Sequence, residues 1–360
     1  MQRPQALSLL ESNNQNSHWK ESALYWVEGF RKALRCAILL GMKNFAFLTA
    51  LLVAGFSSEI RAQSPAEIVA ASPAAAWVEI PAEDLLVMTL PSLPNGPGLP
   101  TGKERRVVIQ LAPAPFAQGW VNNIRTLAKA HWWDGLAITR VQDNYVAQWG
   151  DPDGEDPVKA RALPAGLRQM PEADYVVQGA LPQSKGLEEV FLPRNTALSW
   201  SNFYKGWPVA GAQGQGGPSN WLVHCYGMVG VGRNLSPDTG AGAELYAVIG
   251  HAPRHLDRNI AVVGRVVQGI EHLSSLPRGT AALGFYADSK ERTGITSLRL
   301  VADLPEKERP RFAVLASESA SFQAYAQARA NRRDAFFNIA AGGADLCNIP
   351  VPIRQIASQQ

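Results

Sequence analysis

The chain has 360 residues, 46% of them apolar and 18% charged, which predicts a globular protein of one large or two modest domains. It holds 34 Lys+Arg and 31 Asp+Glu, but seven of the basic and four of the acidic residues lie in the first 62 positions, which leaves 27 of each beyond them. The remainder is formally neutral, so its composition argues against nucleic-acid binding through a broad basic face.

The first 62 residues have the pattern of an export leader. Met42-Lys43 is followed by the uncharged apolar run "NFAFLTALLVAGF", and a short Ile-Arg-Ala sequence then ends at Ala62. This order predicts a secretory signal peptide over residues 42–62, cleaved after Ala62. A buried helix and an uncleaved membrane anchor are the alternatives. Lys43 interrupts the apolar stretch, and the uninterrupted part is too short to span a bilayer.

Residues 1–41 are polar and rich in Asn and Gln, and they precede a start-like Met-Lys pair. We therefore expect translation to begin at Met42. The cleaved protein is predicted to be periplasmic or secreted, with no membrane attachment after cleavage. A protein that stays tethered through its leader is the competing reading.

Two cysteines remain beyond the leader, Cys225 and Cys347. In an oxidising compartment they can pair. Such a bridge would close a loop of roughly 120 residues and add about 4–5 kcal/mol in the chain-entropy model. Two separate buried thiols are the alternative, because the sequence does not give the distance between them.

The predicted elements begin with a flexible Ala-, Ser- and Pro-rich lead-in at residues 63–76. Apolar runs predict strands at 84–90 and 106–112, joined by a long Pro/Gly-rich turn region. Apolar residues at helical spacing follow over 115–135. A short apolar hairpin then occupies residues 136–147, with Asp-Asn turn chemistry at its centre.

A long irregular stretch, 152–220, is rich in Pro, Gly and aromatic residues and is predicted to be an insert. Its aromatic content is too high for a disordered loop, so we expect it to pack as a subdomain. Trp200, Phe203, Tyr204, Trp207 and Trp221 are among the aromatic residues in and beside it. Strand patterns resume in "WLVHCYGMV" and "AELYAVIG" and end at 297–304, and a helical segment begins near Ser321. The chain therefore predicts a mainly β core with few helices.

The order of these segments resembles the cyclophilins, which are peptidyl-prolyl cis–trans isomerases. The segment "VVIQLAPAPFAQGWVNNIRTLAKAHWWDGLAITRVQDNYVAQWGDP" resembles the family's strand, helix, turn and "FHRV…F..QGGDP" signature. The segment "GAELYAVIGHAPRHLDRNIAVVGRVVQGIEHL" resembles its "GSQFFI…LDG…FGRVV.G" half. The resemblance runs in order from about Leu85 to Leu273.

The resemblance implies a closed eight-stranded antiparallel barrel capped by two helices. It places the cyclophilin-like domain at residues 77–304, with the insert at about 152–220 and a C-terminal helical extension at 305–360. It also implies an isomerase that needs no cofactor and acts on proline-containing polypeptides.

The hairpin "TRVQDNYVAQWG" contains Arg140, whose guanidinium is costly to bury without a partner. From the residues alone, Arg140 either extends to solvent along the strand or lies at the lip of a pocket. The resemblance implies the second and makes Arg140 the catalytic residue at the edge of an apolar groove. It implies substrate-binding roles for a further set: Tyr145, Gln148, Met228, Val229, Glu244, Tyr246, His255 and Leu256.

Several of these positions depart from the family pattern. Glu244 replaces a glutamine, Tyr145 and Tyr246 replace phenylalanines, and Gly230 stands where an asparagine usually binds the substrate backbone. Ile260 replaces a histidine or aromatic residue, and His255 a frequent tryptophan.

We predict a prolyl isomerase acting on Xaa-Pro bonds of exported proteins. A catalytically weak or inactive binding module or chaperone of the cell envelope is the alternative. His251, His255 and His224 suggest a metal site, but Pro253 interrupts the helical spacing of the first two, so we expect no metal.

Overall fold

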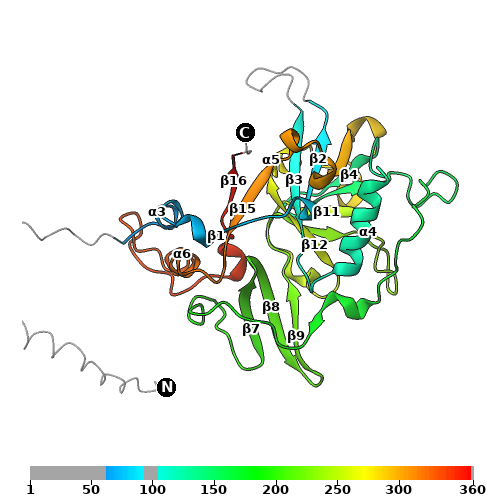
Figure 1. Cartoon of the computed structure of the whole chain (residues 1–360). Helices are drawn as coiled ribbons and strands as arrows, with labels where there is room; N and C mark the ends of the chain where they lie inside the picture. The colour runs from blue at the N-terminus through cyan, green and yellow to red at the C-terminus, as the bar shows by residue number, and fades with distance from the viewer. Residues whose placement is uncertain (1–61, 93–103, 358–360) are drawn as a thin grey trace, which may run out of the picture. The chain divides into compact units, whose positions relative to one another are not determined.

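A computed structural model describes residues 62–92 and 104–357, and these form one compact unit. The predicted leader lies outside the described residues, except for Ala62. Figure 1 shows most of the strands gathered in one curled sheet, with a second, smaller sheet below it in that view.

The main sheet has nine strands, and each neighbouring pair is antiparallel. In order across the sheet they are β13 (Thr293–Gly294), β4 (Ala137–Val141), β5 (Val146–Gly150), β11 (Leu245–Val248), β10 (Met228–Val231), β12 (Val262–Gln268), β3 (Arg105–Leu111), β2 (Leu85–Leu90) and β14 (Ser297–Leu300). The strands predicted at 84–90, 106–112 and 136–147 are therefore present as β2, β3 and the β4–β5 hairpin.

The two edge strands of this sheet, β13 and β14, follow each other in the chain. Only Ile295 and Thr296 separate them; the Ile295 N–H donates to the Leu136 carbonyl beside β4, and the Thr296 N–H donates to the Thr89 carbonyl in β2. The sheet must curl to bring these partners together. The predicted count of eight strands and complete closure are not confirmed: nine strands form an open ladder, because the edge segment changes partner at residues 295–296.

Helix α4 (Gln118–Lys129) packs one face into the core of the curled sheet. Trp120, Ile124 and Leu127 are fully buried along that face, as their helical spacing predicts. The indole N–H of Trp120 donates to the Thr239 and Gly240 carbonyls, which connects the helix to the loop before β11. Helix α5 (Glu271–Ser274), which follows the last long strand of the family-like segment, is a single turn.

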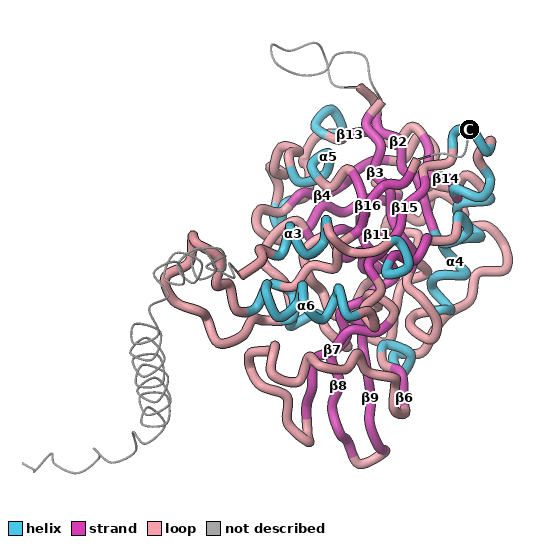
Figure 2. Tube along the Cα trace, turned by 60° about the vertical axis from the view of Figure 1, so that its left-hand side comes forward, coloured by secondary structure: helices cyan, strands magenta, loops and turns pink. Residues whose placement is uncertain are grey.

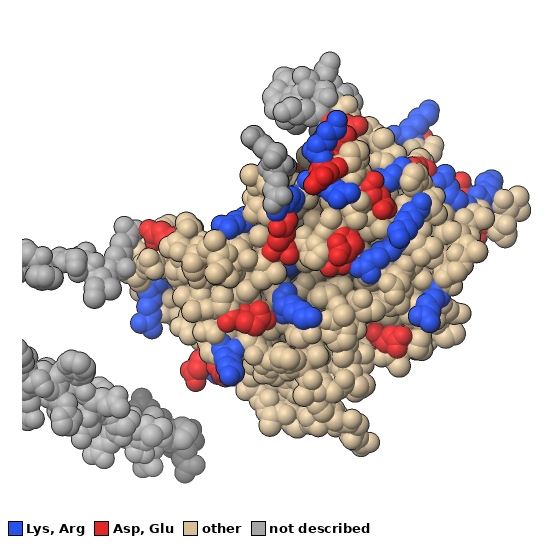
Figure 3. Space-filling view, viewed as in Figure 1, with Lys and Arg blue, Asp and Glu red and all other residues tan. Residues whose placement is uncertain are grey.

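The insert forms its own four-stranded antiparallel sheet. Its order is β6 (Val177–Gln178), β9 (Gly217–Leu222), β8 (Trp207–Gly214) and β7 (Ser199–Tyr204). Phe203 and Trp207 are fully buried and belong to the same hydrophobic core as the strands of the main sheet. Lys205 is the single Lys, Arg, Asp or Glu between Arg194 and Arg233, and Figure 3 shows few charged side chains over this part of the face.

The two ends of the described chain meet in a third sheet. Its strands are β1 (Trp77–Glu79), β15 (Arg311–Leu315) and β16 (Ile353–Ile356). Residues 63–76, predicted to be flexible, instead contain α3 (Pro65–Ala70), which starts with a reciprocal Ser64–Glu67 capping box and packs against α6 (Ala320–Ala330). Figure 2 shows α3 beside α6.

Single 3-10 turns connect many of these elements. They are Ala74–Ala76, Ala82–Asp84, Glu172–Tyr175, Arg254–Leu256, Ala282–Gly284, Ser289–Glu291, Val301–Asp303, Glu306–Glu308 and Leu346–Asn348. Among the residues described, no helix combines the length and apolar character needed to cross a membrane.

Candidate functional site

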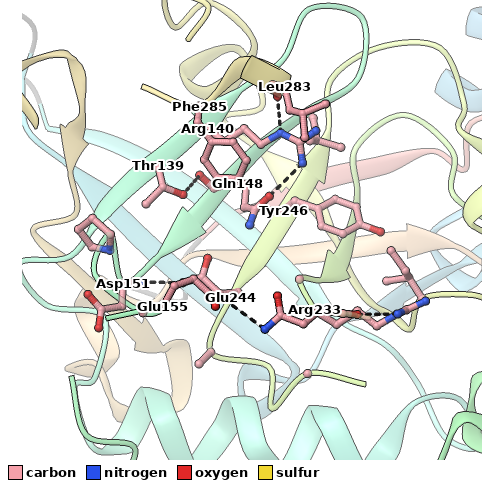
Figure 4. A pocket seen from close by; sticks show the side chains of 18 of the residues that line it. Thr139, Arg140, Gln148, Asp151, Glu155, Arg233, Glu244, Tyr246, Leu283 and Phe285 are labelled. Carbon is pink, nitrogen blue, oxygen red and sulfur yellow. Dashed lines mark hydrogen bonds between the residues drawn. The ribbon is translucent and has the colours of Figure 1, made fainter. Parts of the chain in front are cut away.

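A cavity of about 660 Å³ opens beside β4, β5 and β11. Six of the nine predicted site residues line it: Arg140, Tyr145, Gln148, Glu244, Tyr246 and Leu256. Figure 4 shows Arg140, Gln148 and Tyr246 in its upper part and Asp151, Glu155 and Glu244 in its lower part.

Arg140 lies in β4 next to a register shift against β5, and it is half-buried. Its Nε–H donates to the Leu283 carbonyl at 2.6 Å, and its Nη1 donates to Gln148 Oε1 at 3.4 Å. Its Nη2 donates to Gln142 Oε1. These bonds use three of the five N–H groups of the guanidinium, which leaves two for a ligand.

Two aromatic rings flank the Arg140 guanidinium. Its central carbon lies 5.5 Å from the ring centroid of Tyr145 and 5.3 Å from that of Phe285. Burial lowers the pKa of Arg140 from its usual value, and an arginine remains charged at neutral pH under such a shift. Arg140 therefore lies at the lip of a pocket as a fixed cation, rather than extending freely into solvent.

An apolar pocket adjoins this cation. Val146, Tyr246 and Val248 form a buried cluster there, against which Tyr145, Leu256 and Ile260 pack. The site thus combines an apolar surface with a positively charged donor group at its edge.

Glu244 lies at the other end of the cavity, close to the backbone of β5. Its Oε1 accepts from the Asp151 N–H at 2.8 Å, and Gln148 makes a side-chain hydrogen bond to it. Burial raises the pKa of Glu244 to about 7, and the carboxylates of Asp151 and Glu155 act in the same direction, against those two hydrogen bonds. Gln148 therefore connects a titratable carboxyl to Arg140.

Three predicted site residues do not line the cavity. Met228 and Val229 were placed on the groove wall, but they are buried in the main core, 5% and 1% exposed. His255 is exposed, and its ring stacks on Tyr145 with the centroids 6.2 Å apart. It extends the rim rather than the wall.

From this part of the chain, Gly232 and Arg233 line the cavity. Gly230, at the position of the family's substrate-binding asparagine, is paired with Tyr246 in the sheet and does not line the cavity. The family resemblance has no fixed spacing after "GMVGVG". It therefore could not show which residues of this segment face the cavity.

Sequence reasoning also missed a rim segment that carries Leu283, Phe285 and Tyr286. Phe285 forms an isolated β-bridge with Arg140, so this segment covers one side of the guanidinium. It has no strand or helix periodicity in the sequence, and Leu283 has a φ of 57°, a conformation typical of a local turn. Its position follows from the fold, not from a local pattern.

Residues 99–297, over half of the chain, match the protein family described as "Cyclophilin type peptidyl-prolyl cis-trans isomerase/CLD". The chain belongs to the cyclophilin family. No curated protein matches it.

A solved cyclophilin structure shares the fold of this cyclophilin. Cyclophilin AquaCyp293 from Hirschia baltica has 20% sequence identity and a TM-score of 0.57, with 79% of this chain and 95% of that chain covered. A Cryptosporidium parvum cyclophilin type peptidyl-prolyl cis-trans isomerase has 11% identity and a TM-score of 0.35, with 60% of this chain and 97% of that chain covered.

Two cysteines of this cyclophilin form a disulfide. Cys225 and Cys347 have Cα atoms 5.1 Å apart and are 122 positions apart in sequence. The bridge connects the segment before β10 to the C-terminal extension. Within residues 62–92 and 104–357, no three His, Cys, Asp or Glu side chains come together as a metal-binding group.

Proposed function

We propose that this cyclophilin isomerises Xaa-Pro bonds of polypeptides in the groove lined by Arg140. The observation that carries the proposal is the guanidinium at the edge of an apolar pocket formed by Val146, Tyr246 and their neighbours. The pyrrolidine ring of a proline is apolar, so it fits the pocket, while the peptide bond before it lies within reach of the guanidinium.

Isomerisation needs no proton transfer, nucleophile or metal. Amide resonance sets a rotation barrier of about 18–20 kcal/mol. In the twisted state the proline nitrogen regains its lone pair, and a guanidinium that donates to this nitrogen stabilises that state over the planar one. Turnover near 10³ per second requires a reduction of the barrier by roughly 6–7 kcal/mol. A charge-assisted hydrogen bond from Arg140 and tighter binding of the twisted peptide together supply it.

The geometry of Arg140 suits this task. Its three protein hydrogen bonds and its two aromatic neighbours fix the guanidinium before substrate arrives. A preorganised donor costs no reorganisation during the reaction. Gln148 also remains in the cavity lining, where its amide can hydrogen-bond the substrate backbone.

Arg140→Ala tests the proposal. We expect kcat/KM for cis-to-trans conversion of a short Xaa-Pro peptide to fall by about 100-fold, the loss typical of one transition-state donor. Arg278→Ala is the matched control, because Arg278 pairs with Asp143 at the hairpin tip, outside the cavity lining. Equal rates for the wild type and a folded Arg140→Ala protein would refute the role of Arg140. A wild-type protein that leaves the rate unchanged for every residue tested before proline would favour the non-catalytic binding module.

We further propose that the substrates are exported proteins and that this protein acts in the periplasm or outside the cell. The predicted signal peptide supports this location, and so does the Cys225–Cys347 disulfide, because such bonds persist in oxidising compartments. Recovery of the protein in a periplasmic or culture-medium fraction, with the disulfide intact, is the expected result.

A further inference from the structure

The hydroxyl of Tyr246 has a partner that lies outside the groove. The Tyr246 ring forms part of the apolar pocket, but its Oη lies 2.9 Å from Nε2 of His224, which is fully buried. The two rings are nearly parallel, with an interplanar angle of 15°. A phenylalanine, which the family resemblance implies at this position, would have no such anchor.

The other face of His224 is held by Asp257. Its Nδ1 lies 2.9 Å from Asp257 Oδ1, and its backbone N–H donates to the same oxygen at 3.0 Å. Arg254 Nε donates to the second carboxylate oxygen at 2.6 Å. Burial tends to raise the pKa of Asp257, but the hydrogen bonds from His224 and Arg254 outweigh it and hold the pKa below its usual value.

This arrangement fixes the direction of each hydrogen bond. An ionised Asp257 accepts, so a neutral His224 carries its proton on Nδ1 and leaves Nε2 as an acceptor. Burial raises the pKa of Tyr246 well above its usual value, so the phenol keeps its proton and donates it to Nε2. The ring of Tyr246 is thereby held at its far end.

The backbone of β10 leaves room for this contact. A Cβ on Gly230 would lie 2.3 Å from the Tyr246 hydroxyl oxygen, closer than real Cβ contacts. Gly230, Tyr246 and His224 are therefore one coupled set.

The same network reaches a second part of the pocket lining. Asp257 directly follows Leu256, which lines the cavity, and Ile260 lies three residues later. His224 also precedes Cys225 of the disulfide, so the network is attached to the C-terminal extension.

We propose that His224 is a positioning residue of the isomerase site, which holds the Tyr246 wall and the Leu256 wall of the proline pocket at a fixed separation through hydrogen bonds to Tyr246 and Asp257. This inference rests on the proposed function, and His224 itself does not line the cavity.

A double-mutant cycle on His224 and Tyr246 tests the positioning role. His224→Leu and Tyr246→Phe are each expected to lower kcat/KM about tenfold, mainly through a higher KM, because one buried hydrogen bond that orders the pocket is lost. In the Tyr246→Phe background, His224→Leu should cost clearly less than in the wild type, because only the bonds to Asp257 are then left to lose. A cost of equal size in both backgrounds would overturn the proposal, because a purely structural histidine acts independently of the Tyr246 hydroxyl.

Two further variants, a conservative replacement and a control, accompany the cycle. His224→Gln, whose amide can still reach the hydroxyl, should recover most of the activity that His224→Leu loses. If His224→Leu fails to fold, the NMR comparison of the wild type with Tyr246→Phe still tests the contact. Tyr325→Phe is the matched control: its buried hydroxyl donates to the Pro350 carbonyl in the C-terminal extension, so its removal should leave kcat/KM unchanged. A kcat/KM of His224→Gln no higher than that of His224→Leu would contradict the positioning role of His224.

A readout independent of catalysis separates this proposal from the proposed function. Side-chain ¹⁵N NMR of His224 should show the neutral tautomer protonated on Nδ1, with an Nε2 signal that shifts in Tyr246→Phe. A His224 spectrum that Tyr246→Phe does not change would overturn the proposed positioning role of His224, even if the enzyme is active. If the wild type is inactive but this shift is present, the isomerase proposal fails and the contact between His224 and Tyr246 stands.

Discussion

Glu244→Gln removes the titratable carboxyl group that Gln148 connects to Arg140, and the consequence is calculable. Burial raises the pKa of Glu244 from 4.5 to about 7. A pKa difference of about 2.5 corresponds to about 3 kcal/mol of folding free energy. Because the folded state binds the proton more tightly, the wild type loses this stability as pH rises from about 4.5 to about 7. The Glu244→Gln protein has no such loss at this position.

Urea denaturation of the two proteins between pH 4.5 and 8.5 measures this effect. The free energy of unfolding of Glu244→Gln minus that of the wild type should rise by about 3 kcal/mol across the window. Glu155→Gln is the matched control, since Glu155 lines the same cavity but is exposed. A difference that does not vary with pH would refute the assignment of a raised pKa to Glu244.

The same titration should appear in catalysis. An ionised Glu244 accepts from the Gln148 amide, which leaves Gln148 Oε1 for the Arg140 guanidinium. A protonated Glu244 competes as a donor for that oxygen, so kcat/KM of the wild type should rise with pH through about 7. The pH–rate profile of Glu244→Gln should lack this inflection; an unchanged inflection would mean that another group causes it.

Three further outcomes are expected. Replacing Cys225 and Cys347 by alanine should lower the free energy of unfolding by about 5 kcal/mol in the chain-entropy model, because the bridge closes a 122-residue loop; denaturation under non-reducing conditions measures it, and a loss below about 1 kcal/mol would contradict it. Gly230→Ala should raise KM, because its Cβ would displace the Tyr246 ring; an unchanged KM in a folded variant would contradict this geometry. N-terminal sequencing of the protein recovered from cells should begin at Gln63, and a sequence that begins within residues 1–41 would exclude cleavage.

The sequence predicted the elements that have a strong local signal. The β4–β5 hairpin and α4 follow from apolar periodicity, and Arg140 and Gln148 lie in the hairpin itself, so the family signature located them directly. The second half was harder, because Met228 and Val229 were assigned by order rather than by register. They belong to the core, and in this half of the chain the residues that line the cavity begin at Gly232.

Other features depend on contacts between segments far apart in the chain. Phe285 lies 145 positions after Arg140 in the sequence and forms an isolated β-bridge with it. No local sequence pattern predicts this bridge. The disulfide was predicted only as one of two alternatives, since pairing depends on a distance that the fold sets. Helix α3 is a different case, because its Ser64–Glu67 capping box is visible in the sequence but lies in an Ala- and Pro-rich stretch that resembles a linker.

The departures from the family pattern are best understood as linked sets rather than single losses. A tyrosine at position 246 would bury an unsatisfied hydroxyl, at a cost of about 1–3 kcal/mol, if His224 were not there to accept from it. The same tyrosine would collide with any side chain larger than glycine at position 230. Tyr246, His224 and Gly230 therefore keep an aromatic ring in the groove wall. In this protein the ring is held by a hydrogen bond from its hydroxyl to His224. Glu244 differs in kind, because it adds a proton-dependent contact to the residue that holds Arg140, and so it is the position where this groove should respond to pH.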